Sequence, residues 1–494
     1  MRKDRILRDI GTIEQLEEEW QSIDWHTVDK RVKNLRRRIF RSIKDGQWNQ
    51  ARSLMKLMLR SHSNLLQSVR KVTQENQGKK TPGIDKQVVT TPAGRMKLTR
   101  SMLTHEAWRV RPARRVYIPK ADGKQRPLGI LTVKNRVAQA IVKNALEPIW
   151  EAQFEQHSYG FRPGRSAHDA IAQCFNRLNG RSKDQWVLDA DIKAAFDNIN
   201  HGFIMKRIGL IPGRELVKHW LAAGYVETDV FNKTESGVPQ GGVISPLLAN
   251  IAMDGLEALV GKCGFIRYAD DFVITARTKE QLLEVLPKIE EFLLERGLHL
   301  NSEKTQIRSI NDGFDFLGFN IRRYGKKCLI KPQKKKVLNM LQEIRVWLKK
   351  NQTKEAGYVI RFLNPRIDGW ANYYRHVVSK AVFNYVDHQI FRALWSWCKR
   401  RHPTKSRGWT ANKYFGIGKG NRTWLFHGNA KDPNGNLRKF ILKRIQEKPI
   451  KRHIKINGSA CPDDGTLVEY WRERERRLNH PCIQVRGEWA PSPV

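Results

Sequence analysis

Two adjacent aspartates, Asp270 and Asp271, end a four-residue turn that begins at Tyr268. The flanking residues, 264–267 and 272–275, are mostly apolar and rich in β-formers, so we expect a hairpin with two carboxylates at its tip. Adjacent carboxylates beside buried strands repel each other and lose hydration, and a bound cation normally offsets that cost. Hard carboxylate oxygens suit Mg²⁺. Taken alone, this stretch fits a solvent-exposed acidic turn equally well.

A catalytic metal site would need a third acid, and Asp189 and Asp191 are the best candidates. In a strand over residues 186–192 both lie on one face, whereas the other face is apolar. If this strand shares a sheet with the hairpin, it supplies the opposing carboxylate. Two metal ions about 4 Å apart could then activate a 3′-hydroxyl and stabilise a leaving pyrophosphate. The alternative is an edge strand whose polar face meets water.

Residues 115–130 are predicted to form a second hairpin that turns at Asp122 and Gly123. Lys120 and Arg126 could clamp a triphosphate from its two arms, the arginine by its planar fork and the lysine as a point charge. We expect the two cations to share a face, so the turn should not be a simple two-residue turn. Two ordinary surface cations are the alternative.

A loop rich in glycine and proline, residues 236–246, precedes a helix that we expect to run to about Val260. Such a loop lets the backbone lie against a flat ligand, and Gln240 within it could contact a base or a sugar. A glycine-rich helix entrance is weak evidence by itself. The sequence offers no Ser/His/Asp or Cys/His nucleophile set.

Composition points to a nucleic-acid partner. The 494 residues include 91 Lys and Arg against 49 Asp and Glu, a formal charge of +42. So large an excess favours a polyanion, and it runs along the whole chain rather than in one amphipathic, membrane-surface segment. No run of 18 apolar residues exists, so no membrane partner is expected. The six scattered cysteines favour a reducing cytoplasm. Cys461, His480 and Cys482 fit no zinc-finger or HNH spacing.

The chain divides into four predicted regions. Residues 1–78 are helical, with a basic face that includes Arg36, Arg37 and Arg38, and its single sign favours a phosphate contact over an ordinary solvated face. Short β-rich runs then alternate with helices, followed by helices and by a basic tail, so the fold class is α+β. The remaining bounds are 79–332 for the mixed region, 333–424 for the helices and 425–494 for the tail.

Taken together, these stretches resemble a bacterial group II intron-encoded reverse transcriptase/maturase, and the resemblance covers nearly the whole chain. The resemblance implies a right-hand polymerase: fingers and palm with an antiparallel sheet, a helical thumb (the maturase X domain) and a basic C-terminal DNA-binding region. The stretches that carry it are Tyr-Ala-Asp-Asp at 268–271, Asp-Ile-Lys-Ala-Ala-Phe-Asp at 191–197, Gly-Val-Pro-Gln-Gly-Gly-Val-Ile-Ser-Pro at 237–246, and residues 81–85, 158–165, 300–305, 314–319 and 369–374.

The same resemblance assigns roles. It makes Asp191, rather than Asp189, the third catalytic acid beside Asp270 and Asp271, with Asp271 the more expendable of the pair. Two Mg²⁺ ions and dNTP substrates are implied. The assignments are Asp191, Ile192, Asp270 and Asp271 as metal ligands, Lys120, Arg126, Phe196 and Gln240 for the dNTP, with Phe196 excluding a 2′-hydroxyl, Pro239, Gly241 and Gly242 for the template cradle, and Arg375 beside Arg36, Arg37 and Arg38 for RNA.

The implied partners are the parent group II intron RNA, an RNA template with its primer, and a DNA target. The implied functions are reverse transcription of the intron during retrohoming and assistance to its splicing. No paired cysteines and histidines of an HNH endonuclease follow the basic tail, so second-strand cleavage is not expected from this chain. Two alternatives stay open at this point: a splicing-only RNA-binding maturase and a reverse transcriptase of a defence system.

Overall fold

The chain folds into two compact units. One takes the residues up to 170 together with 187–307 and 456–473, and the other takes 171–186, 308–455 and those from 474 onward. The computed structural model describes residues 12–104, 108–119, 123, 125–180, 182–416, 424–432 and 435–479.

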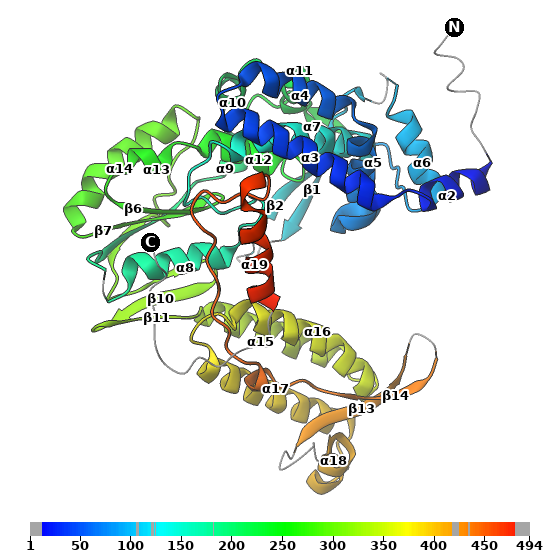
Figure 1. The fold of residues 1–494 in the computed structure, drawn as a ribbon. Coiled ribbons are helices and arrows are strands. Elements are labelled where there is room, and N and C mark those ends of the chain that lie inside the picture. Colours follow the sequence, from blue (N-terminus) through cyan, green and yellow to red (C-terminus); the bar gives the residue numbers. More distant parts are fainter. Residues whose placement is uncertain are drawn as a thin grey trace. The chain divides into compact units, whose positions relative to one another are not determined.

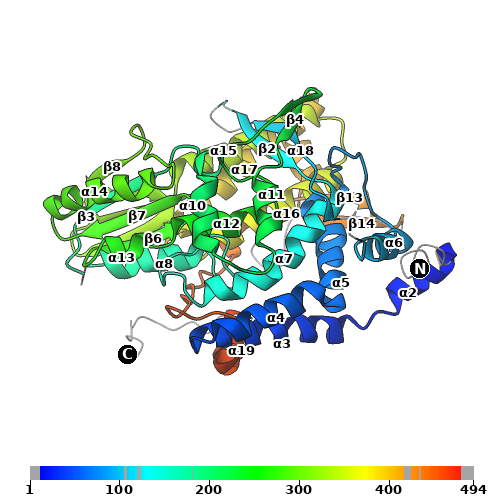
Figure 2. The same ribbon diagram turned by 90° about the horizontal axis from the view of Figure 1, so that it is seen from above.

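Helices form the N-terminal part of the first unit (Figures 1 and 2). The long helix α3 buries Val28, Val32, Ile39 and Ile43 along one stripe, which confirms the helical prediction. It packs on α4, α5 and α7. The bounds are α2 Ile13–Gln21, α3 Trp25–Lys44, α4 Trp48–Arg60, α5 His62–Arg70, the π-helical turn η1 Lys71–Glu75, the 3₁₀ turn η2 Gln77–Lys80, α6 Pro92–Ser101 and α7 Val133–Glu151.

A four-stranded sheet of the first unit has the order β2-β1-β4-β5. Its hairpin of β1 and β2 is the one predicted from residues 115–130. The strands are β1 Ala113–Pro119, β2 Gln125–Ile130, β4 Tyr225–Glu227 and β5 Val230–Asn232. Strand β1 is antiparallel to β2 and parallel to β4.

The second four-stranded sheet has the order β6-β7-β3-β8. Residues 272–274 of β7 are fully buried, and α14 packs on this strand. The predicted helix to about Val260 is wrong in one respect. It breaks into α12 and α13, because Gly255 between them has a left-handed φ of 113°. The bounds are β3 Trp186–Asp191, β6 Gly264–Tyr268, β7 Asp271–Ala276, β8 Gln306–Ser309, α9 Ala195–Asn198, α10 His201–Ile208, α11 Arg214–Leu221, α12 Ser245–Met253, α13 Leu256–Leu259 and α14 Lys279–Leu294.

The second unit combines a small sheet, β11-β10-β9, with long helices. Two predicted core stripes are confirmed: one on α15, at positions 337, 341, 344 and 348, is fully buried, and one on α17 is buried except at its half-buried first residue, Val382. The hairpin of β13 and β14 packs on α16 (Figure 1). The bounds are β9 Phe314–Phe316, β10 Phe319–Tyr324, β11 Lys327–Pro332, α15 Lys334–Lys350, α16 Ala356–Tyr374, α17 Lys380–Arg401, α18 Arg407–Tyr414, β12 Phe415–Gly416, β13 Leu425–Lys431, β14 Leu437–Ile441 and the 3₁₀ turn η4 Ile445–Glu447. Helix α8 Ala167–Leu178, the 3₁₀ turn η5 Gly465–Leu467 and α19 Val468–Asn479 complete the described elements.

Residues 456–473, which we call the C-terminal strap, fold with the first unit although they are far along the sequence. The strap's Asp463 lies 2.6 Å from the guanidinium of Arg36 on α3. The main-chain N–H of Ile456 donates to the carboxylate of Asp169 at 2.7 Å. These two contacts tie the strap to the first unit.

The predicted α+β class is confirmed, because helices and mainly antiparallel sheets occur in both units. Among the described residues, no helix combines the length and the apolar character that crossing a membrane requires.

Candidate active site

The two aspartates lie where the sequence predicted them, at the tip of the hairpin formed by β6 and β7. Tyr268 pairs with Asp271, so Ala269 and Asp270 form a two-residue connection. Ala269 has a φ of 60°, the left-handed conformation that tight hairpins use. The short connection projects the two carboxylates from the end of a buried sheet.

Strand β3 lies between β7 and β8, so the edge-strand alternative is wrong. Asp191 is its last residue and is half-buried, whereas Leu188 and Ala190 are buried. The third acid is thus on the strand beside the hairpin, as the shared-sheet hypothesis required.

Burial and the charge of Asp191 both affect the ionisation of the two hairpin acids. Burial raises the pKa of Asp270, and the charge of Asp191 adds to this rise. The pKa of Asp271 rises to about 7, because burial is reinforced by Asp270 and Asp191 and a hydrogen bond with Asp191. Repulsion among buried carboxylates has this effect when their charge lacks enough compensation.

Lys304, a residue with no role predicted from the sequence, supplies part of the compensating positive charge. Its Nζ lies 2.7 Å from Oδ2 of Asp191, and this contact raises the pKa of Lys304. Asn301 also donates to Oδ2 of Asp191, at 3.2 Å. Both belong to the stretch 300–305, so the family resemblance was the only signal that could have found them.

The predicted triphosphate clamp is described only in part, because Lys120 lies outside the described residues. Arg126 is exposed, and its charge lowers the pKa of Asp270 against the larger effect of burial. Five residues separate the paired Pro119 and Gln125, so the turn is not a simple two-residue turn, as predicted. Arg126 pairs with Ile118, and the expectation that it shares a face with Lys120 stays a prediction.

The helix-opening loop is tied to the segment that follows Asp191. The main-chain N–H of Val238 donates to the carbonyl of Phe196 at 2.6 Å. Phe196 and Asp270 line one cavity of about 10 Å³, which has room for about one water molecule. The Gln240 amide donates to the carboxylate of Asp197 at 3.3 and 3.4 Å.

The glycines of this loop permit close approach. Gly241 has a φ of 112°, and a Cβ there would lie 2.8 Å from the carbonyl oxygen of Gly129. A Cβ on Gly242 would lie 2.4 Å from Oγ of Ser245. Pro239 is half-buried beside them. The loop therefore packs tightly on neighbouring backbone, whatever it binds.

Comparison with known proteins places these elements in a family. Residues 20–102 match the N-terminal domain of reverse transcriptase, 118–321 match reverse transcriptase (RNA-dependent DNA polymerase), and 337–415 match the group II intron maturase-specific domain. The chain belongs to the group II intron reverse transcriptase/maturase family. It is an RNA-directed DNA polymerase with a maturase domain.

Individual relatives agree with the assignment. Protein YkfC of Escherichia coli (strain K12) is 33% identical over 332 residues, which are 56% of this chain and 87% of YkfC. Group II intron-encoded protein LtrA of Lactococcus lactis subsp. cremoris is 43% identical over 154 residues, 30% of this chain and 25% of LtrA. An uncharacterized 91 kDa protein in the cob intron of Schizosaccharomyces pombe is 29% identical over 288 residues, 44% of this chain and 35% of its own length.

The reverse transcriptase site has carboxylate oxygens of the kind that bind hard cations, but they do not converge on one point. Within the described ranges, no three acidic, histidine or cysteine side chains are arranged closely enough to hold a metal ion as they stand. Asp191 is drawn toward Lys304 instead. The raised pKa values of Asp270 and Asp271 nevertheless reflect ionised carboxylates that are poorly stabilised, and a divalent cation would stabilise them. Carboxylate oxygens are suitable ligands for such a cation. The buried side chain of Ile192 is a hydrocarbon, so only its main-chain carbonyl could contribute an oxygen.

The four arginines predicted to contact RNA differ in their exposure. The prediction for Arg36 is wrong, because its guanidinium is bonded to Asp463 and Glu147 and its side chain is only 13% exposed. Arg38 is exposed and Arg37 half-buried on the same helix, so they stay predictions. Arg375 is half-buried at the end of α16 and also stays a prediction.

Proposed function

We propose that the chain copies RNA into DNA at the site formed by Asp191, Asp270 and Asp271. The observation that supports this most directly is the meeting of three acids on neighbouring strands, where the charge of Asp191 helps to raise the pKa values of Asp270 and Asp271. Such a cluster attracts divalent cations and the polyphosphate complexes that carry them. Because residues 118–321 match the reverse transcriptase family, nucleotidyl transfer is the reaction that we assign to this cluster.

The proposed cofactor is Mg²⁺, as two ions held by Asp191 and Asp270, with Asp271 and the main chain of Ile192 as further ligands. When bound, these ions would activate the primer 3′-hydroxyl and neutralise the leaving pyrophosphate. Lys304 is paired with Asp191 in the structure. On metal binding its side chain either leaves Asp191 or stays as an additional cation beside the phosphates.

The residues around the acids select and hold the incoming dNTP in this proposal. Arg126 and Lys120 bind the triphosphate, and Phe196 blocks a 2′-hydroxyl. Gln240 contacts the nucleotide after leaving Asp197. The template lies on the loop that contains Pro239, Gly241 and Gly242, whose tight packing gives it a fixed surface.

The proposed partners are the parent group II intron RNA, an RNA template with its primer, and a DNA target for retrohoming in the cytoplasm. The match of residues 337–415 to the maturase-specific domain supports the intron RNA and weighs against a defence system. The +42 charge supports nucleic acid in general. We keep the four regions 1–78, 79–332, 333–424 and 425–494 as the proposed extension, polymerase, thumb and DNA-binding region.

Primer extension on an RNA template with Mg²⁺ and dNTPs tests the polymerase site. We expect the wild type to extend the primer and Asp270→Ala to lose extension while keeping template affinity. A splicing assay with the parent intron should show that Asp270→Ala still assists splicing, because RNA binding does not need the acid. Unchanged extension by Asp270→Ala would remove the site from the reaction.

A further inference from the structure

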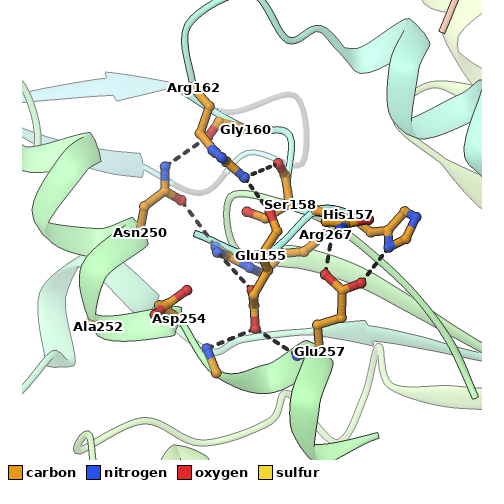
Figure 3. Close-up of polar contacts among 12 residues, drawn as sticks. Glu155, His157, Ser158, Gly160, Arg162, Asn250, Ala252, Asp254, Glu257 and Arg267 are labelled. Carbon is orange, nitrogen blue, oxygen red and sulfur yellow. Dashed lines mark hydrogen bonds and ion pairs between the residues drawn. The ribbon is translucent and has the colours of Figure 1, made fainter. Parts of the chain in front are cut away.

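A buried arginine lies directly behind the acidic hairpin. Arg267 is on β6, one residue before the Tyr268 to Asp271 turn, and its side chain is 1% exposed. One guanidinium nitrogen, Nη1, donates to the carbonyl oxygen of Ala269 at 3.2 Å. The same nitrogen donates to Oδ1 of Asn250 at 3.1 Å (Figure 3). Arg267 therefore contacts the main chain of the turn that carries Asp270.

The contact continues through Asn250 on α12. Its Nδ2 donates to the carbonyl oxygen of Gly160 at 2.9 Å, as Figure 3 shows. Gly160 in turn packs on the turn itself, since a Cβ there would lie 2.3 Å from the nitrogen of Ala269. Arg267 thus binds a carbonyl of the turn, Gly160 packs closely against its main chain at Ala269, and Asn250 is hydrogen-bonded to both Arg267 and Gly160.

The backbone of Arg267 is fixed as well. Its N–H donates to the carbonyl of His157 at 2.9 Å, and its own carbonyl accepts from the N–H of Tyr159 at 2.8 Å. Residues 157–160 therefore lie along β6 and continue to the turn. Neither end of the arginine is free to shift without moving this segment.

The positive charge of Arg267 is balanced by the nearby carboxylates of Glu155 and Asp254. Burial lowers the pKa of its guanidinium, and the carboxylates of Glu155 and Asp254 oppose that effect. Oε2 of Glu155 lies 3.7 Å from Nη2. An apolar residue would serve stability at least as well as a buried ion pair of this kind, so the cation calls for a second role. The hydrogen bonds of Nη1 to the carbonyl oxygen of Ala269 and to Oδ1 of Asn250 supply one.

We propose that Arg267 is a positioning residue for the polymerase reaction: through Ala269 and Asn250 it fixes the turn so that the carboxylate of Asp270 has one orientation. This rests on the proposed role of Asp270. Arg267 touches no substrate in this scheme and acts only through the turn. A catalytic group misplaced by about 1 Å loses on the order of 100-fold in rate, so loss of the Nη1 hydrogen bonds should reduce the rate of the chemical step.

The test compares conservative lysine variants of two buried arginines in the full-length chain. Arg267→Lys keeps the charge beside Glu155 and Asp254, but the lysine side chain is one bond shorter, so its nitrogen does not reach the place of Nη1 between Ala269 and Asn250. Arg296→Lys is the matched control, because Arg296 is also buried, donates to the carbonyls of Ala252 and Phe292, and has no contact with the turn among its described hydrogen bonds. Asp270→Ala is measured alongside as the reference for the proposed site.

Single-nucleotide addition at saturating template–primer gives kcat and the dNTP KM. We expect Arg267→Lys to lower kcat by about 10- to 100-fold with a KM within about threefold of wild type, and Arg296→Lys to keep kcat within about twofold. Asn250→Ala removes the hydrogen bonds to Arg267 and Gly160 and should lower kcat less, by about 3- to 10-fold. The double variant Arg267→Lys with Asn250→Ala should lose less than the product of the two single losses, because both act on one turn.

Three results would overturn the inference: a kcat for Arg267→Lys within about twofold of wild type, an equal loss in Arg296→Lys, or a double variant whose losses multiply. Should Arg267→Lys fail to fold, as judged by its melting transition, Asn250→Ala against Arg296→Lys decides the question. If Asp270→Ala also retains activity, the proposed site itself fails. If Asp270→Ala is inactive and Arg267→Lys is normal, only the positioning role fails.

Discussion

At the scale of residues, the region behind the hairpin shows how buried charge is used in pairs. Glu155 accepts main-chain N–H groups of Gly255 and Glu257 at 2.8 and 2.7 Å, and its neighbour Glu257 binds His157 (Figure 3). The main chain of His157 in turn contacts Arg267. Glu257 therefore supports the segment that lies along β6, and the pH dependence of stability should reveal its contribution.

Glu257 gives a prediction for pH. Burial alone would raise the pKa of Glu257, but hydrogen bonds from His157 outweigh it and the pKa lies below its ordinary value. The charged carboxylate therefore adds stability above its unfolded-state pKa, and this stability disappears as the pH falls through the lower pKa of the folded state. We expect Glu257→Gln to destabilise the protein at pH 7 by about 1.5 kcal/mol. The difference from wild type should shrink below about pH 4.5.

Thermal melting of both proteins from pH 7 down to pH 4 measures this difference. Glu284→Gln, which changes an exposed glutamate of α14, is the control and should show no such trend. A difference for Glu257→Gln that stays constant down to pH 4 would contradict the assigned role of the carboxylate.

At the scale of elements, the hairpin depends on one close contact that only glycine allows. A Cβ at Gly160 would lie 2.3 Å from a main-chain nitrogen, which cannot move aside as a flexible side chain does. Gly160→Ala should therefore push the turn from its place, destabilise the protein by about 1–3 kcal/mol and lower primer extension at least about tenfold. Gly369→Ala is a matched control, since this helical glycine has no atom within 4 Å of an added Cβ. It should leave extension unchanged and be neutral or slightly stabilising.

Urea unfolding and primer extension on the two alanine variants decide the matter. Equal behaviour of Gly160→Ala and Gly369→Ala in both measurements would mean that the close approach at the turn has no consequence.

The elements themselves could be predicted from local pattern, whereas their charged contacts could not. The alternation of acids and apolar residues in 186–192 predicted β3, and helical spacing predicted the stripes of α3, α15 and α17. Arg36 looked like one more cation on a basic face, yet its partner Asp463 is 427 positions away. The contact of Lys304 with Asp191 spans 113 positions. No local period carries such information, because only the folded backbone decides which distant carboxylate a cation meets.

At the scale of the molecule, the formal charge of +42 should dominate affinity for nucleic acid. The logarithm of the template–primer association constant should fall linearly with the logarithm of salt concentration, because each neutralised phosphate releases counterions. Replacing Arg37 and Arg38 by Met should reduce the slope by about two, one for each phosphate that the helix no longer neutralises. Filter binding across a salt series measures both. A nearly flat dependence would show that the charge serves another purpose, and an unchanged slope in the variant would exclude this helix from the interface.

The C-terminal strap gives a prediction about a contact between residues 427 positions apart in the sequence, Arg36 and Asp463. Arg36, Asp463 and Glu147 join the strap to α3 and α7, and their side chains are only 13%, 6% and 11% exposed. Removing the cation leaves two buried carboxylates without the partner they share, so Arg36→Met should cost about 3–5 kcal/mol of unfolding free energy. Asp463→Asn should cost less, because Glu147 still faces Arg36.

Chemical unfolding of the full-length chain tests the strap. Lys233→Met breaks an exposed pair with Glu235, whose side chains are 76% and 84% exposed, and should change stability by less than about 0.5 kcal/mol. The double variant Arg36→Met with Asp463→Asn should be less destabilised than the sum of its two single changes, because it removes the charge that the single change leaves unpaired. A loss of stability for Arg36→Met no larger than that for Lys233→Met would mean that the strap rests on the surface without this ionic anchor. The expected loss would instead make residues 456–473 a structural part of the polymerase unit, in addition to any role of the neighbouring basic residues on DNA.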